Sequence, residues 1–149
     1  MEPNKDFKEL LELFSENSVE FVIVGAYALA FHGAPRFTGD LDLLVRPDSQ
    51  NASRILRALD TFGFGSVGLQ TKDFSELDQI IQLGVPPLRI DLLTSISGVS
   101  WEQAWANKVS GFYHDLPVFF LGKDEFIANK KAAGRPQDLA DVAALDSSS

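Results

Sequence analysis

Three aspartates lie on two short segments that are otherwise apolar. Asp40 and Asp42 belong to DLDLLV at residues 40–45, and Asp91 belongs to LRIDLL at residues 88–93. Side chains two residues apart in a β-strand point to the same face, so Asp40 and Asp42 project together while the alternating leucines enter the opposite face. A carboxylate beside an apolar core costs free energy unless it has a partner. The pattern therefore raises the question of what these acids bind.

Carboxylate oxygens are the ligands that hard cations such as Mg²⁺ prefer. If the second segment is a strand beside the first, Asp91 completes a cluster of three acids with Asp40 and Asp42. Such a cluster can hold two Mg²⁺ ions, the arrangement that clamps the attacking and leaving oxygens in phosphoryl transfer. Taken alone, Asp40 and Asp42 also fit an edge strand with two solvent-facing acids, and short motifs of this kind occur often by chance.

The turn before these aspartates is a candidate phosphate site. VGA at residues 24–26 passes from an apolar strand to a helix of small residues, a junction that offers backbone N–H groups and a positive dipole end. Arg36 lies four residues before the first aspartate, where its guanidinium could reach a phosphate, brace the carboxylates or form a surface salt bridge. Thr38 either favours the strand conformation or positions an aspartate by hydrogen bonding.

The composition is that of a soluble globular domain. Of the 149 residues, 45% are hydrophobic and 23% are charged, and 13 basic against 21 acidic side chains give a net charge of -8. This acidic balance argues against extensive, salt-driven coating of nucleic acids, although it leaves room for a local basic pocket. The chain has no cysteine, which excludes disulfides and thiolate metal sites and agrees with a cytoplasmic location.

The ends of the sequence lead to expectations about targeting and domain bounds. The acidic, amphipathic N-terminal segment is unlike a signal peptide, and the longest apolar runs are too short to span a bilayer. We therefore expect no membrane association. We expect one domain over residues 1–146, followed by a disordered tail at residues 147–149.

Hydrophobic periodicity and turn residues predict alternating helices and strands. A central hairpin turns at the glycine and prolines of residues 84–87, and the mixture indicates an α+β or mixed α/β fold. Helices are expected at 5–16, 26–31, 50–62, 101–105, 124–133 and from 136 onward, and strands at 21–24, 40–45, 77–83, 88–93 and 116–121.

Two stretches resemble a known superfamily. FVIVGAYALAFHGAPRFTGDLDLLV at residues 21–45 is similar to the signature of DNA polymerase β-type nucleotidyltransferases, above all their small prokaryotic members. In that signature a strand ending in Gly, a small-residue helix, Arg-x-Thr and Asp-x-Asp follow in this order. FIANKKAAGRPQDLADVAAL at residues 126–145 resembles the tail of minimal members related to toxin–antitoxin and abortive-infection systems.

The resemblance implies a minimal nucleotidyltransferase fold, with a central mixed β-sheet flanked by helices and further helices at the C-terminus. It also implies roles for individual residues. Metal binding and catalysis fall to the three acids, with Asp91 also helping to deprotonate the acceptor. The remaining nucleotide-binding residues it implies are Gly25, Ala26, Arg36, Thr38 and Lys130.

Within the C-terminal basic cluster, the resemblance favours Lys130 over Lys131, since neighbours on a helix diverge by about 100° and only one can easily face a site. Capping of the helix C-terminus is the alternative for either lysine. Asp138 lies at the start of the last helix and is interpreted as a capping residue. In the glycine turn the superfamily commonly has Gly-Ser or Gly-Gly, whereas this chain has Gly25-Ala26, which keeps the N–H groups but lacks a hydroxyl.

The function implied is metal-dependent transfer of a nucleoside monophosphate from an NTP such as ATP to an acceptor hydroxyl. Two Mg²⁺ ions are expected, with Mn²⁺ as a substitute. The acceptor is left open among a tRNA 3′ end, a protein side chain and a small molecule, and a cognate toxin or antitoxin is an expected partner. The alternative is a catalytically weak or inactive module that acts as an antitoxin or as a nucleotide-binding partner protein.

Overall fold

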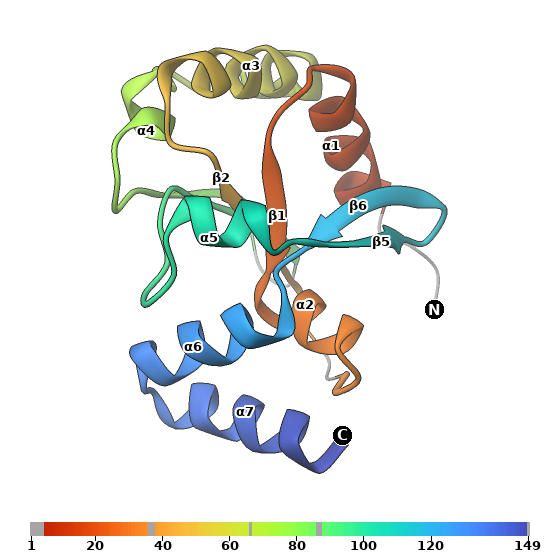
Figure 1. The fold of residues 1–149 in the computed structure, drawn as a ribbon. Helices are drawn as coiled ribbons and strands as arrows, with labels where there is room; N and C mark the ends of the chain where they lie inside the picture. Colours follow the sequence, from red (N-terminus) through yellow and green to blue (C-terminus); the bar gives the residue numbers. More distant parts are fainter. Residues whose placement is uncertain (1–4, 36–37, 66, 86–87, 149) are drawn as a thin grey trace.

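The computed structural model of the chain describes residues 5–35, 38–65, 67–85 and 88–148. Helices and strands alternate along it (Figure 1). In chain order the elements are α1 (Lys5–Glu16), β1 (Phe21–Val24), α2 (Gly25–Phe31), β2 (Asp40–Val45), α3 (Ser49–Leu59), a π-helical turn η1 (Asp60–Phe64), α4 (Lys72–Ser75), β3 (Ile80–Val85), β4 (Leu88–Leu93), α5 (Trp101–Ala106), β5 (Val109–Tyr113), β6 (Leu116–Phe120), α6 (Lys123–Ala133) and α7 (Pro136–Ser148).

The strands described form one mixed sheet in the order β3-β4-β2-β1-β6-β5. At its centre, β2 pairs antiparallel with β1 on one side and parallel with β4 on the other. β3 and β4 form an antiparallel hairpin at one edge, and β5 and β6 form another at the opposite edge. The mixed sheet flanked by helices confirms the fold class expected from the sequence.

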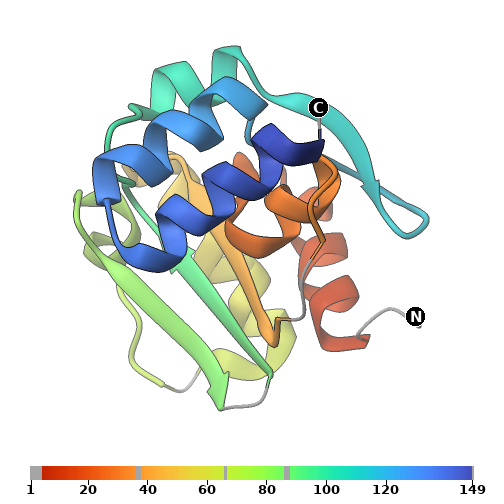
Figure 2. The ribbon, with the colours of Figure 1, turned by 90° about the horizontal axis from the view of Figure 1, so that it is seen from below.

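Helices cover both faces of this sheet. α1 and α3 lie on one face, whereas α2, α6 and α7 lie on the other (Figure 1). Viewed from below, α6 and α7 run side by side in front of α2 and the central strands (Figure 2). The apolar side of α1 (Phe7, Leu10, Leu11 and Phe14) is buried in the core, as its helical spacing predicts. In β2, Leu41 and Leu43 are fully buried, on the face opposite Asp40 and Asp42.

Most of the predicted elements are present, with differences at several of them; the helix expected at 50–62, for example, ends at Leu59 as α3 and is followed by η1. The strand predicted at 77–83 begins three residues later, as β3. The short helix α4 and the edge strand β5 have no counterpart in the prediction. Helix α7 reaches Ser148, so the part of the predicted disordered tail that the structure describes is helical. No helix within the described residues is long and apolar enough to cross a membrane.

A buried asparagine joins the two strands that lead to the carboxylates. Asn51, at 1% exposure, donates its Nδ2 hydrogens to the carbonyl oxygens of Glu20 (3.1 Å) and Arg46 (3.0 Å). Its Oδ1 accepts from the backbone N–H of Glu20 at 2.8 Å. Glu20 precedes β1 and Arg46 follows β2, so one side chain connects the open end of this antiparallel pair.

We expect Asn51→Ala to lower the free energy of unfolding by about 3 kcal/mol, because it removes three hydrogen bonds of a buried side chain, each contributing about 1 kcal/mol, and leaves the backbone N–H of Glu20 without the Asn51 acceptor. Urea unfolding followed by circular dichroism measures this loss. The matched control is Gln50→Ala in the same helical turn, where the side chain is exposed and the expected change is within about 0.5 kcal/mol. Similar losses in the two variants would contradict the role assigned to Asn51.

Candidate active site

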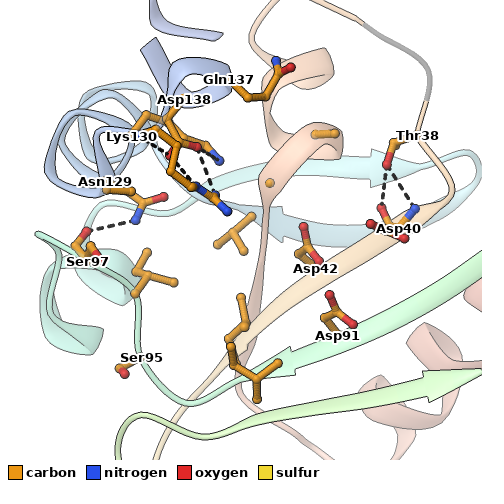
Figure 3. A pocket seen from close by; sticks show the side chains of 18 of the residues that line it. Thr38, Asp40, Asp42, Asp91, Ser95, Ser97, Asn129, Lys130, Gln137 and Asp138 are labelled. Carbon is orange, nitrogen blue, oxygen red and sulfur yellow. Dashed lines mark hydrogen bonds and ion pairs between the residues drawn. The ribbon is translucent and has the colours of Figure 1, made fainter. Parts of the chain in front are cut away.

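The predicted site residues gather around a cavity of about 880 Å³. Its wall is formed where β1 meets α2, by the neighbouring strands β2 and β4, and by the C-terminal helices α6 and α7 (Figure 3). Arg36 lies outside the residues that the structure describes. The other predicted residues all line the cavity: Gly25, Ala26, Thr38, Asp40, Asp42, Asp91 and Lys130.

The register of the sheet brings the second and third acids together. Parallel pairing of β2 with β4 places Asp42 opposite Asp91, and Asp40 opposite Arg89. The side chains of Asp42 and Asp91 project into the same part of the cavity (Figure 3). The expectation that Asp91 lies on a strand beside Asp40 and Asp42 is therefore confirmed.

The glycine turn approaches the Asp42 carboxylate closely. Gly25 has φ +68°, in the left-handed region that favours glycine. A Cβ atom at this position would collide with Oδ2 of Asp42 and approach its Cγ to 3.1 Å. The glycine that ends β1 thus leaves room for the carboxylate, a role that the strand–glycine–helix pattern alone did not indicate.

The Asp42 carboxyl group has an unusual affinity for protons. Burial, together with the negative charges of Asp91 and Asp40 and a hydrogen bond with Asp91, raises the pKa of Asp42 to about 6. Lys130 acts in the opposite direction from across the cavity. Asp42 and Asp91 therefore form a crowded acidic pair that a proton or another cation stabilises.

Arg89 was not among the predicted site residues, yet it contacts two of the three acids. Its Nη2 lies 3.3 Å from Oδ2 of Asp40 and 3.3 Å from Oδ2 of Asp91. The available signal was its spacing, because Arg89 stands two residues before Asp91 and a strand brings such neighbours to one face.

In this arrangement the acids do not form the expected cluster of three. Among the described residues, no three histidine, aspartate or glutamate side chains converge as a group that could hold a metal ion. Asp40 instead forms an ion pair with Arg89, whose Nη2 lies 3.3 Å from Oδ2 of Asp40. Thr38 fixes the backbone here, since its Oγ1 accepts from the N–H of Asp40 at 3.0 Å.

A second charged group lies across the cavity, on α6 and α7. Asp138, at 1% exposure, accepts from Nζ of Lys130 at 3.3 Å and from Nε of Arg135 at 2.7 Å. It also accepts from the backbone N–H of Arg135, which confirms its interpretation as a capping residue. Its place in the cavity wall was not predicted. Lys130 lines the cavity while Lys131 is exposed, as the helical divergence of the two lysines requires.

The oxygen donors of this site suit a hard divalent cation. Oδ1 of Asp91 is buried and makes no hydrogen bond, and its ionic contact is with Nε of Arg89 at 3.1 Å, so a cation that displaces the guanidinium would find an unsatisfied carboxylate oxygen there. The cavity wall also carries five aspartates against three basic side chains, an excess of negative charge that a cation would balance. Asp42 and Asp91 are the residues that fit such an ion in the arrangement observed.

We expect Gly25→Ala to destabilise the protein more than a glycine substitution that only introduces backbone strain. Alanine in the left-handed conformation costs about 1–2 kcal/mol, and at Gly25 the collision with Asp42 adds to that cost. The control is Gly134→Ala, with φ +67° and its nearest new contact at 3.6 Å. Equal losses in the free energy of unfolding, measured in urea, would contradict the close approach.

We expect the pH dependence of stability to change in Asp42→Asn. A pKa raised to about 6 in the folded state means that Asp42 favours folding while it is protonated, and that this contribution is lost as the pH rises from 4 to 7. In EDTA, wild type should therefore lose up to about 3 kcal/mol of stability relative to Asp42→Asn between pH 4 and 7.5. Urea unfolding at several pH values measures the difference, and a constant difference would contradict it.

Comparison with known proteins supports the fold and identifies the family. The family model described as "Nucleotidyl transferase AbiEii toxin, Type IV TA system" matches residues 10–109. No curated protein sequence matches the chain significantly. The crystal structure of the lincosamide antibiotic adenylyltransferase LnuA with lincomycin bound has a similar fold, with a TM-score of 0.62 at 13% identity over 98% of both chains.

A candidate nucleotidyltransferase from Thermotoga maritima is also similar, with a TM-score of 0.57 at 15% identity over 95% of this chain and 88% of that chain. At these identities the two structures establish the nucleotidyltransferase fold alone. The family model covers two thirds of the sequence, including the glycine turn and all three aspartates. The chain therefore belongs to the AbiEii nucleotidyltransferase toxin family of type IV toxin–antitoxin systems.

Proposed function

We propose that the protein transfers a nucleoside monophosphate from an NTP to an acceptor hydroxyl, and that this reaction depends on a divalent metal ion. The observation that carries the proposal is the Asp42–Asp91 pair, which faces a cavity of about 880 Å³ in a chain of nucleotidyltransferase family and fold. An acidic pair in which the pKa of Asp42 is raised to about 6 and Oδ1 of Asp91 makes no hydrogen bond is suited to binding a cation.

Asp42 and Asp91 would hold Mg²⁺, or Mn²⁺ in its place, with Asp40 as a further ligand; the resemblance to the superfamily implies two ions. When bound, the metal supplies positive charge to the oxygens of the transferred phosphoryl group and of the leaving group. Because phosphoryl transfer depends mainly on positioning and electrostatics, a small domain with few reacting side chains is sufficient.

The remaining side chains would orient the nucleotide and accept a proton. The backbone N–H groups at Gly25 and Ala26 would bind the β- and γ-phosphates, and Lys130 would neutralise charge that develops on the pyrophosphate. Asp91, whose Oδ1 makes no hydrogen bond, would take the proton from the acceptor hydroxyl. Thr38 supports Asp40 through its backbone, and Arg36 is assigned to the phosphates by the resemblance alone.

The acceptor and the partner belong to the proposal. A tRNA 3′ end, a protein hydroxyl and a small molecule are all compatible with the open cavity, and the similar structure LnuA is an adenylyltransferase with a small molecule, lincomycin, bound. The type IV toxin–antitoxin family suggests a cognate antitoxin as the partner.

The test is incubation of the protein with each labelled NTP and Mg²⁺, in separate reactions with tRNA, a protein fraction and lincomycin. We expect label in one acceptor class, and a loss of at least about 100-fold in Asp42→Asn and Asp91→Asn, because each removes an oxygen that stabilises charge in the transition state. Asp124→Asn is the control, since this exposed acid on α6 lies outside the cavity wall and should retain full activity.

Undiminished labelling in Asp42→Asn would refute the metal-dependent mechanism. NTP binding with no label in any acceptor would instead favour the alternative, a nucleotide-binding module without catalytic activity.

A further inference from the structure

Arg89 occupies the position at which the three acids could otherwise meet. Its Nη2 lies between Asp40 and Asp91, 3.3 Å from a carboxylate oxygen of each. The pairing of β2 with β4 causes this, because Arg89 stands opposite Asp40 and two residues before Asp91 on the same face. In the described structure, the guanidinium of Arg89 therefore supplies the positive charge that contacts Asp40 and Asp91.

The contact between Arg89 and Asp91 is close but poorly matched. Nε of Arg89 lies 3.1 Å from Oδ1 of Asp91, yet both atoms are buried and neither makes a hydrogen bond. A well-matched arginine–carboxylate pair makes two parallel hydrogen bonds. Two unsatisfied buried atoms weaken the ion pair, so a ligand with a better match to Asp91 can displace the guanidinium.

The surroundings of Arg89 allow it to leave. Its side chain is 29% exposed and that of Asp40 is 42% exposed, so the guanidinium has a route to solvent. The other two basic residues of the described cavity wall, Lys130 and Arg135, are both held by Asp138. Of these three basic residues, Arg89 is thus the one that forms ion pairs with Asp40 and Asp91.

We propose that Arg89 is a positioning residue that substitutes for a divalent cation between Asp40 and Asp91, so that metal binding must displace it. The inference rests on the proposed metal-dependent function and deepens it. Before the metal binds, the positive charge of Arg89 reduces the repulsion between the acids in the folded chain. Because the metal must break the contacts of Arg89 with Asp40 and Asp91, Arg89 lowers the metal affinity by the free energy of those contacts. Removal of the guanidinium should strengthen metal binding and destabilise the metal-free protein.

The test is titration of metal-free wild type, Arg89→Gln and Arg89→Lys with Mn²⁺ alone, without nucleotide, by isothermal titration calorimetry. We expect the Kd of Arg89→Gln to be lower by about tenfold, which corresponds to about 1.4 kcal/mol. Arg89→Lys should be intermediate, because it keeps the charge and loses the planar, two-pronged contact. It also provides the test if Arg89→Gln does not fold.

The matched control is Arg135→Gln, which removes a positive charge from the same cavity wall but contacts Asp138 and none of the three acids. It separates displacement from a general change in charge, and its Kd should fall by less than about threefold. A second readout is the melting temperature: Arg89→Gln should melt lower than wild type in EDTA and gain more from Mn²⁺.

Each outcome of this titration is decisive. An unchanged or higher Kd in Arg89→Gln, or an equal decrease in Arg135→Gln, overturns the inference while the proposed function stands. If neither wild type nor Arg89→Gln binds Mn²⁺, both fail. Asp42→Asn should lose Mn²⁺ binding, and full retention would place the ion elsewhere and overturn the inference as well.

Discussion

Repulsion between acids on adjacent parallel strands is the constraint on which the rest of the site depends. β2 and β4 place Asp42 opposite Asp91 at the spacing of neighbouring strands, about 4.8 Å, beside a buried sheet. Two carboxylates cannot both remain charged there without compensation. The molecule has two compensations of its own: the guanidinium of Arg89 and, as the pH falls below about 6, protonation of Asp42, whose pKa is raised to that value. A divalent cation would be a third.

The fold holds the acids in place despite this repulsion. Leu41 and Leu43 alternate with the aspartates and are fully buried, so that β2 cannot turn its acids away without exposing the core. Asn51 joins the backbone at the open end of β1 and β2, and Gly25 leaves space for the Asp42 carboxylate at the other end. Core packing of the leucines and the absence of a side chain at Gly25 together hold the aspartates in an arrangement that their mutual repulsion opposes.

Local patterns in the sequence were sufficient for most of the fold. The alternation of acid and leucine predicts β2 with its observed bounds, and Ser100, just before the helix expected at 101–105, caps α5 by accepting a hydrogen bond from the backbone N–H of Gln103. β5 escaped prediction because it is an edge strand with mostly exposed side chains and a glycine at its centre, so it shows no alternation of buried and exposed residues. At four residues, α4 is too short for helical periodicity to be visible.

The sequence was sufficient to predict which residues line the site, but not most of the contacts between them. The strand patterns predicted that Asp91 lies near Asp40 and Asp42. The ion pairs of Arg89, however, depend on the register between β2 and β4, which local sequence patterns do not determine. The same holds for Asp138, whose capping role is local while its contact with Lys130 joins two helices. Sequence spacing determines which face a side chain takes, and only the tertiary pairing determines its partner.

The charged side chains of the cavity wall come from two parts of the chain, the sheet and the C-terminal helical region. Asp40, Asp42 and Asp91 come from β2 and β4, inside residues 10–109 that the family model matches, whereas Lys130 comes from α6 and Arg135 from the junction of α6 and α7, beyond it. Asp138 neutralises these two basic side chains in part through its ion pairs with both, and Figure 3 shows Lys130 and Asp138 across the cavity from Asp42 and Asp91. Because Lys130 still lowers the pKa of Asp42, its charge acts across the cavity. The C-terminal helices therefore complete an electrostatic site that the sheet alone leaves acidic.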